Sequence, residues 1–106
     1  MAEYGREYIL SNRVFNDVNN LNLLLDTLHF IAGITKKKVK RGRIRKTKKF
    51  RVVIKARPYS RYFGEVKIIV YDDDTKKIKF HDRVPIALPV EKMIKIRGAI
   101  LLFSEK

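Results

Sequence analysis

Residues 50–72 read FRVVIKARPYSRYFGEVKIIVYD and contain two runs in which apolar side chains recur at every second position. A period of two is typical of β-strands, because successive side chains point to opposite sides of a sheet. Pro58, Tyr59 and Ser60 separate the runs and favour a turn. The stretch therefore predicts two strands with one buried face, formed by Phe50, Val52, Ile54, Ala56, Val66, Ile68 and Val70.

The chain after residue 72 predicts further strands. The polar residues 72–75 favour a turn, and Ile78 and Phe80 then alternate with polar neighbours as in a third strand. Pro85 and Pro89 interrupt regular structure. Residues 93–103 have two interpretations: their β-branched side chains and Gly98 favour a strand, whereas Pro89 could open a short helix. We expect a strand there, preceded at most by a helical turn.

Residues 17–32 carry the helix signal. Asn16 or Asp17 can cap the start and Gly33 the end, and no Pro or Gly lies between them. The apolar stripe is Val18, Leu21, Leu25, Leu28 and Ala32, with Asn19, Asn22, Asp26 and His29 on the opposite side. Leu23 and Phe30 form a second apolar patch, which we expect the sheet to cover; a subunit contact is the alternative.

These elements predict a fold class. At 106 residues with 45% hydrophobic content, the chain is long enough for one core and is expected to form a single domain over residues 1–106. We expect an α+β fold in which an N-terminal amphipathic helix (about 17–32) packs on an antiparallel sheet of about four strands within residues 50–103. Residues 36–49 are expected to project as a basic arm or β-ribbon with Gly42 near its tip.

The net charge of +14 is local. Residues 36–61 contain 14 of the 25 Lys and Arg residues and no Asp or Glu, so the other 11 basic residues balance the 11 acidic ones. A block of one sign attracts a polyanion, and nucleic acid is the commonest polymer with a regular array of negative charge. We therefore expect nucleic-acid binding without catalysis and without a cofactor.

Two groups of residues form the expected nucleic-acid site. Tyr59 and Tyr62 lie beside arginines in a turn and are expected to stack on bases, although Tyr62 or Phe63 could instead belong to the core. The phosphate contacts are expected from Lys36, Lys37, Lys38, Lys40, Arg41, Arg43, Arg45, Lys46, Lys48, Lys49, Arg51, Lys55, Arg57 and Arg61. The residues themselves do not distinguish DNA from RNA, because no RNP, zinc-finger, GXXG or helix-turn-helix pattern is present.

A metal-dependent nuclease is the enzymatic alternative. Its ligands would come from carboxylates between residues 65 and 82, and Glu65-Val66-Lys67 matches the Glu-x-Lys fragment of a common nuclease site. Asp72, Asp73 and Asp74 are better explained as a solvated turn, and His81 as an exposed strand residue. We expect neither catalytic residues nor a metal site.

Other features limit the location and partners. The chain has no Cys and therefore no disulfide or Cys-based zinc site. No apolar stretch reaches the length of a membrane span, and the first fifteen residues lack a signal-peptide core. These features predict an intracellular protein that does not bind membranes; a homodimer that buries Leu23 and Phe30 remains open.

The Cys-free composition, the Asn- and Leu-rich helix, the run KKKVKRGRIRKTKK (residues 36–49) and the Ile- and Tyr-rich strands together resemble small basic proteins of filamentous viruses of hyperthermophilic archaea. This resemblance is one of composition. It implies a thermostable viral protein, in the host cytoplasm or the virion, that binds the genome or its transcripts, and it favours double-stranded DNA. A ribosomal or other RNA-binding protein is the alternative.

Overall fold

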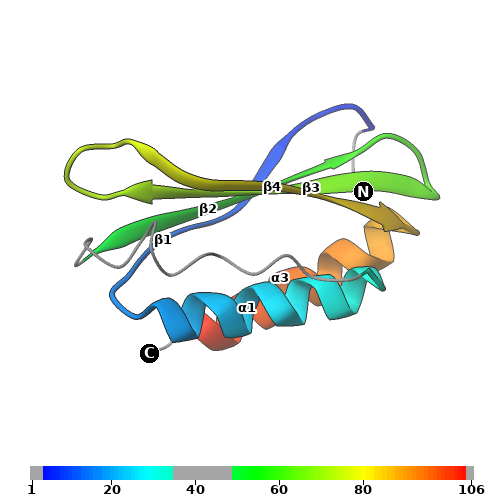
Figure 1. Cartoon of the computed structure of the whole chain (residues 1–106). Helices are drawn as coiled ribbons and strands as arrows, with labels where there is room; N and C mark the ends of the chain where they lie inside the picture. The colour runs from blue at the N-terminus through cyan, green and yellow to red at the C-terminus, as the bar shows by residue number, and fades with distance from the viewer. Residues whose placement is uncertain (1–3, 35–48, 105–106) are drawn as a thin grey trace.

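The computed structural model describes residues 4–34 and 49–104, which form two layers (Figure 1). One layer is a four-stranded antiparallel sheet, and the other consists of two helices that lie side by side on one face of that sheet and run in opposite directions. The elements in chain order are β1 (Tyr8–Phe15), α1 (Val18–Ala32), β2 (Phe50–Pro58), β3 (Phe63–Asp72), β4 (Ile78–Ala87) and α3 (Pro89–Ser104).

The strands follow the order β1-β2-β3-β4, and each pairs antiparallel with its neighbour. The β2–β3 register is continuous from Phe50 opposite Asp72 to Pro58 opposite Gly64. Strand β1 has an irregularity between Ile9 and Ser11, at the open edge of the sheet. A bulge at an edge discourages pairing with another sheet.

The core lies between the sheet and the helices. Phe15 and Phe50 stack at one end of it, with ring centroids 6.1 Å apart. Gly64 lies at the other end, where β3 passes close to the start of α3. The buried side chains that fill the core are Leu21, Leu24, Leu25, Leu28, Phe50, Val52, Ile54, Ala56, Val66, Ile68, Val70, Val84, Ile86, Ile96 and Ile100.

Helix α1 begins and ends through local contacts. The Asp17 side chain accepts a hydrogen bond from the Asn19 amide at 2.9 Å and caps the start. Gly33 adopts φ 73° after the last turn, a conformation that glycine reaches without steric cost, and its N–H bonds to the carbonyl of Phe30. These contacts place the helix within the range that the sequence predicts.

The predicted fold class is wrong in the order and type of its elements. The helix is not N-terminal, because β1 precedes it and pairs with β2. Residues expected to form a strand after Pro89 form α3, which begins at this proline because the first helical position needs no backbone donor. Ile96, Ala99 and Ile100 are buried on one side of that helix. The fold is α+β in the order β-α-β-β-β-α.

Two further expectations are corrected. Pro85 does not end the third predicted strand, since β4 continues to Ala87; β4 is an edge strand, where a residue without an N–H is tolerated. The sheet does not cover the second patch of α1, because Leu23 and Phe30 remain exposed. The buried stripe of α1 already occupies the side of the helix that faces the sheet.

Candidate nucleic-acid interface

The sheet face opposite the helices carries a row of cations. Arg51, Lys55 and Arg57 alternate with buried residues of β2 and are partly exposed. The register places Lys55 opposite Lys67 of β3, and Lys67 opposite Arg83 of β4. Directly opposed residues share a face, and neighbouring strands lie about 4.8 Å apart, so these three cations span roughly 10 Å across three strands. We call Lys55, Lys67 and Arg83 the cation row.

Two acidic residues lie next to this row: Glu65, directly opposite Arg57 in the register, and Glu7, which precedes β1. Glu7 makes the closer contacts with the row. Its carboxylate accepts a hydrogen bond from Lys67 Nζ at 3.2 Å and lies 3.6 Å from both Lys55 Nζ and Arg57 Nη2. The hydrogen bond from Lys67 and the nearby positive charges lower the pKa of Glu7, against the opposing effect of burial. Arg57 Nε is buried without a hydrogen-bond partner in the described structure. Glu7 and Glu65 therefore offset only two of the four positive charges of Lys55, Arg57, Lys67 and Arg83, and a local excess of positive charge remains.

Arg51 is held at the end of the face near the β3–β4 turn. Its Nε donates to Asp73 Oδ1 at 3.1 Å and its Nη1 donates to Asn12 Oδ1 at 2.9 Å. The hydrogen bond from Arg51 lowers the pKa of Asp73, and Lys76 adds to the effect from 3.4 Å. This guanidinium therefore connects β1 and β2 to the turn, and it is less available to a ligand than the sequence suggests.

The hairpin tip between β2 and β3 exposes aromatic rings. Tyr59 and Phe63 stack with centroids 5.5 Å apart, and the Tyr59 hydroxyl donates to Glu65 Oε1 at 3.0 Å. Tyr62 and Arg61 are exposed beside them. Neither Tyr62 nor Phe63 belongs to the core, so the alternative that one of these two rings is a core residue is wrong. The tip can offer ring faces to unpaired bases.

Most of the predicted basic arm lies outside the described residues. Lys49, the last residue of this segment, is exposed and directly precedes β2. The segment therefore joins the sheet at the strand that carries Arg51, Lys55 and Arg57. The predicted phosphate contacts outside the described residues are Lys36, Lys37, Lys38, Lys40, Arg41, Arg43, Arg45, Lys46 and Lys48.

The carboxylates of the nuclease alternative are engaged separately. Asp72 Oδ1 accepts hydrogen bonds from the amides of Asp74 and Thr75 at 2.9 and 3.2 Å, which is the geometry of an ordinary polar turn. Glu65 is bonded to Tyr59, and Asp82 is buried on the other side of β4. Within residues 4–34 and 49–104, no three His, Asp or Glu side chains are grouped so that they could hold a metal ion.

A buried polar pair was missed at the sequence level. His29 and Asp82 are 2% and 7% exposed, and His29 Nε2 lies 3.0 Å from Asp82 Oδ2. His29 was expected on the polar side of α1, but that side turns partly toward β4, where Asp82 supplies a partner. The pairing joins positions 53 residues apart, and no local pattern indicates it. Because both groups are buried, the pair stabilises the fold and offers no access to a substrate.

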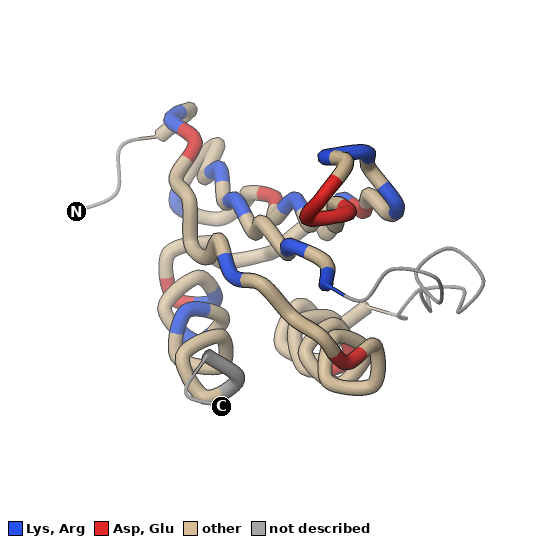
Figure 2. Tube along the Cα trace, turned by 90° about the vertical axis from the view of Figure 1, so that its left-hand side faces the viewer, with Lys and Arg blue, Asp and Glu red and all other residues tan. Residues whose placement is uncertain are grey.

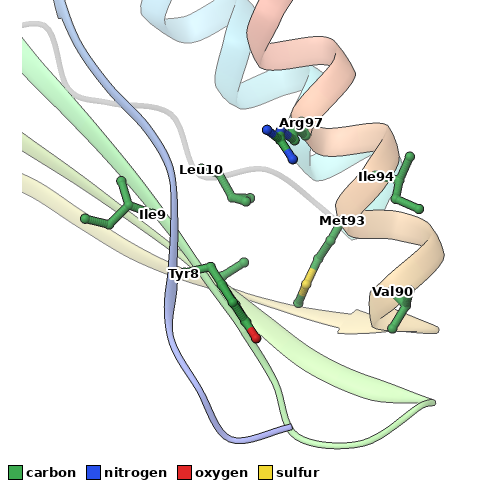
Figure 3. Close-up of a pocket in the computed structure, with 8 residues that line it drawn as sticks. Tyr8, Ile9, Leu10, Val90, Met93, Ile94 and Arg97 are labelled. Atoms are coloured by element: carbon green, nitrogen blue, oxygen red, sulfur yellow. The ribbon is translucent and has the colours of Figure 1, made fainter. Parts of the chain in front are cut away.

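A groove lies on the other side of the sheet, between β1 and α3 (Figure 3). Its volume is about 490 Å³. Met93 of α3 points across it toward Tyr8 of β1, and Arg97 provides its charged group. An apolar groove with a single guanidinium can hold an apolar segment, but it contains no pair of groups for acid–base catalysis.

No helix among the described residues is long and apolar enough to cross a membrane. Comparison with protein-family models, curated proteins and solved structures returns no match for this chain. The features of this chain that could bind a ligand are the cation row, the hairpin tip and the basic segment that precedes β2.

Proposed function

We propose that the protein binds nucleic acid without catalysis, mainly through phosphate contacts, and that double-stranded DNA is its preferred ligand. The observation that carries this proposal is the cation row, in which Lys55, Lys67 and Arg83 stand directly opposite one another on three neighbouring strands. Like charges in directly opposed positions destabilise a sheet, and Glu7 offsets this repulsion only in part, between Lys55 and Lys67. A ligand with closely spaced negative charges removes that repulsion and gains affinity from released counterions.

The location of the row supports this function. The face that carries it is not covered by any element within residues 4–34 and 49–104 (Figure 2). Residues 36–49 carry ten cations and directly precede β2 in the chain, so we propose that they add phosphate contacts to those of the row. Tyr59 and Tyr62 add ring faces at one end of the sheet, which would also serve single strands or RNA loops. The preference for duplex DNA comes from the resemblance in composition.

The location of the protein follows from the same proposed function. A protein that binds a genome or its transcripts acts inside a cell or a virion, and a Cys-free chain fits a reducing compartment. We therefore place it in the host cytoplasm or the virion, as a viral protein, in line with the resemblance.

The test is a fluorescence-anisotropy titration of labelled duplex DNA, single-stranded DNA and duplex RNA between about 50 and 200 mM salt. We expect the logarithm of the binding constant for duplex DNA to fall steeply with the logarithm of salt, by about 0.9 per phosphate neutralised. Arg83→Gln should lower this slope by about 1, because the Arg83 side chain has no partner within the described residues and is available to phosphate.

Lys95→Gln is the matched control, because Lys95 is exposed on α3, in the layer that faces away from the row. If this control lowers the slope as much as Arg83→Gln, the sheet face is not the interface. If the wild-type protein binds none of the three polymers at about 50 mM salt, the proposed function is wrong.

A further inference from the structure

The two helices expose apolar side chains on the side that faces away from the sheet. On α1, Leu23 and Phe30 are seven residues apart and therefore lie on one side of the helix. On α3, Ile94, Leu101 and Leu102 occupy the corresponding side, opposite the buried Ile96 and Ile100. Phe30 is 83% exposed, and Ile94 and Leu102 are each 70% exposed. We call these five residues the helix underside.

The helix underside is as large as the largest apolar patches that monomers usually expose. The two helices lie side by side (Figure 1), and each carries its exposed apolar residues on the side away from the sheet. With roughly 180 Å² for a fully exposed large side chain, the five residues offer on the order of 600 Å² per copy. Typical monomers have a largest apolar patch of about 300–600 Å², whereas each partner of a standard interface buries about 800 Å². The apolar area is therefore at the upper limit for a monomer and supplies most of what a dimer interface requires.

The charge distribution favours a second copy on this surface. Helix α1 contains no Lys or Arg, whereas α3 contains Lys92, Lys95 and Arg97 against Glu91 (Figure 2). When the twofold axis runs parallel to the helices, α1 of each copy meets α3 of the other, so the helix without Lys or Arg faces the basic one. The same arrangement keeps the two cation rows at maximum separation, which limits repulsion between protomers of charge +14.

Gly98 fits this arrangement. It lies on the outer side of α3 between Ile94 and Leu102, and a Cβ atom built there would meet no atom within 4 Å. An exposed glycine inside a helix lowers helix stability relative to alanine, so the fold alone does not call for it. A residue without a side chain allows a facing helix to approach closely.

We propose that the helix underside binds a second copy of this chain, forming a dimer with four layers in the order sheet, helices, helices, sheet. Both open sheet faces then point outward, in opposite directions. If the proposed function also holds, one dimer can bridge two segments of nucleic acid. The dimer itself does not depend on that function, since its interface contains none of the proposed binding residues.

Sedimentation equilibrium of the full chain without nucleic acid tests the dimer, from about 1 µM to 1 mM protein. We expect a monomer–dimer equilibrium that strengthens from about 50 to 500 mM salt, because salt screens the repulsion between protomers. Nucleic-acid binding should have the opposite salt dependence. Phe30→Gln and Leu102→Gln should each raise the dimer Kd by about thirtyfold, as loss of a central apolar contact does.

Ile78→Gln is the matched control, because Ile78 is 60% exposed on β4, away from the helices. This variant should dimerise like the wild type. A wild-type protein that stays monomeric at about 1 mM in high salt overturns the proposal. An equal loss of dimer in Ile78→Gln and Phe30→Gln also overturns it, because the effect would then not belong to the helix underside.

A bridging assay connects the dimer to the proposed function. Two duplexes with different fluorophores should show energy transfer with wild-type protein, whereas Phe30→Gln should bind each duplex but lose the transfer. Binding without a dimer would overturn the interface and leave the proposed function standing. A dimer that does not bind nucleic acid would overturn the proposed function and leave the interface standing. The assay therefore distinguishes failure of one proposal from failure of the other.

Discussion

The buried pair of His29 and Asp82 allows a quantitative prediction for Asp82→Ala. His29 Nδ1 lies 2.7 Å from the Leu25 carbonyl oxygen, which can only accept, so Nδ1 carries the donated hydrogen. Its Nε2 then depends on Asp82 Oδ2 at 3.0 Å. Asp82 Oδ1 also accepts the Arg83 amide at 2.9 Å. The substitution therefore removes two hydrogen bonds at once.

The size of the expected loss in unfolding free energy follows from the burial of both side chains. A buried polar group left without its partner costs about 1–3 kcal/mol, and loss of an ordinary hydrogen bond costs about 1 kcal/mol more. Because His29 is almost inaccessible to water, we expect Asp82→Ala to lower the free energy of unfolding by about 2–4 kcal/mol. A domain of this size has about 5–15 kcal/mol in total, so a large part of its stability would be lost. Asp82→Asn keeps an acceptor and should lose less.

Urea unfolding followed by circular dichroism measures this effect, with equal m-values showing that the variants are compared between the same states. In the His29→Leu background, the substitution Asp82→Ala should cost at least about 1 kcal/mol less, because no unsatisfied imidazole remains. The reasoning is refuted if Asp82→Ala costs less than about 1 kcal/mol, or if its cost is the same in both backgrounds.

Three further predictions concern stability. Leu25→Ala should lower the free energy of unfolding by about 2–5 kcal/mol in the same urea assay, because Leu25 is fully buried under the sheet; a loss below about 1 kcal/mol would contradict the described core. Gly64→Ala should lower the melting temperature in calorimetry, since its Cβ would lie 2.8 Å from the Arg57 carbonyl oxygen and 2.9 Å from Pro89 Cβ; an unchanged melting temperature would show that β3 can shift. The pKa of Glu7 is lowered from its ordinary value of 4.5, so its contribution to stability is present above about pH 4.5 and is lost as the pH falls through the folded-state pKa. Urea titrations between about pH 2 and 6 should therefore show a smaller acid loss for Glu7→Gln than for the wild type, and identical pH profiles would contradict the role of its three cations.

The part of the candidate site that lies on β2 could be predicted from the sequence, because the alternation within a single strand is enough to place it. The alternation in β2 places Arg51, Lys55 and Arg57 on the side opposite the core, as their partial exposure shows. The row itself needed the β2–β3–β4 register, because Lys67 and Arg83 are ordinary polar positions when each strand is considered alone. Glu7 could not be assigned to the site at all, because it directly precedes β1, a strand that was not predicted, and only the pairing of that strand with β2 brings it there.

Strand β1 and helix α3 were also not predictable from local sequence patterns. Strand β1 lies at an edge, where polar residues such as Asn12 and Arg13 face solvent, so its hydrophobic alternation is weak. The segment of α3 contains β-branched residues that suit a strand when isolated, and propensity is easily overridden by packing. Residues 89–104 form a helix because the apolar face of the sheet beside α1 must be covered, and Ile96 and Ile100 of α3 cover it.

By itself, the sequence determined the features that depend on neighbouring residues: the extent and capping of α1, the alternation of β2 and β3, and the concentration of charge between residues 36 and 61. The tertiary structure alone decided which strands pair, that residues 89–104 become a helix, that His29 is buried against Asp82, and that Leu23 and Phe30 stay exposed. The reason is physical. Helix caps, turns and strand alternation arise from contacts between residues that are close in the chain. Strand register, burial and the pairing of charged residues across strands arise from contacts between residues that are distant in the chain.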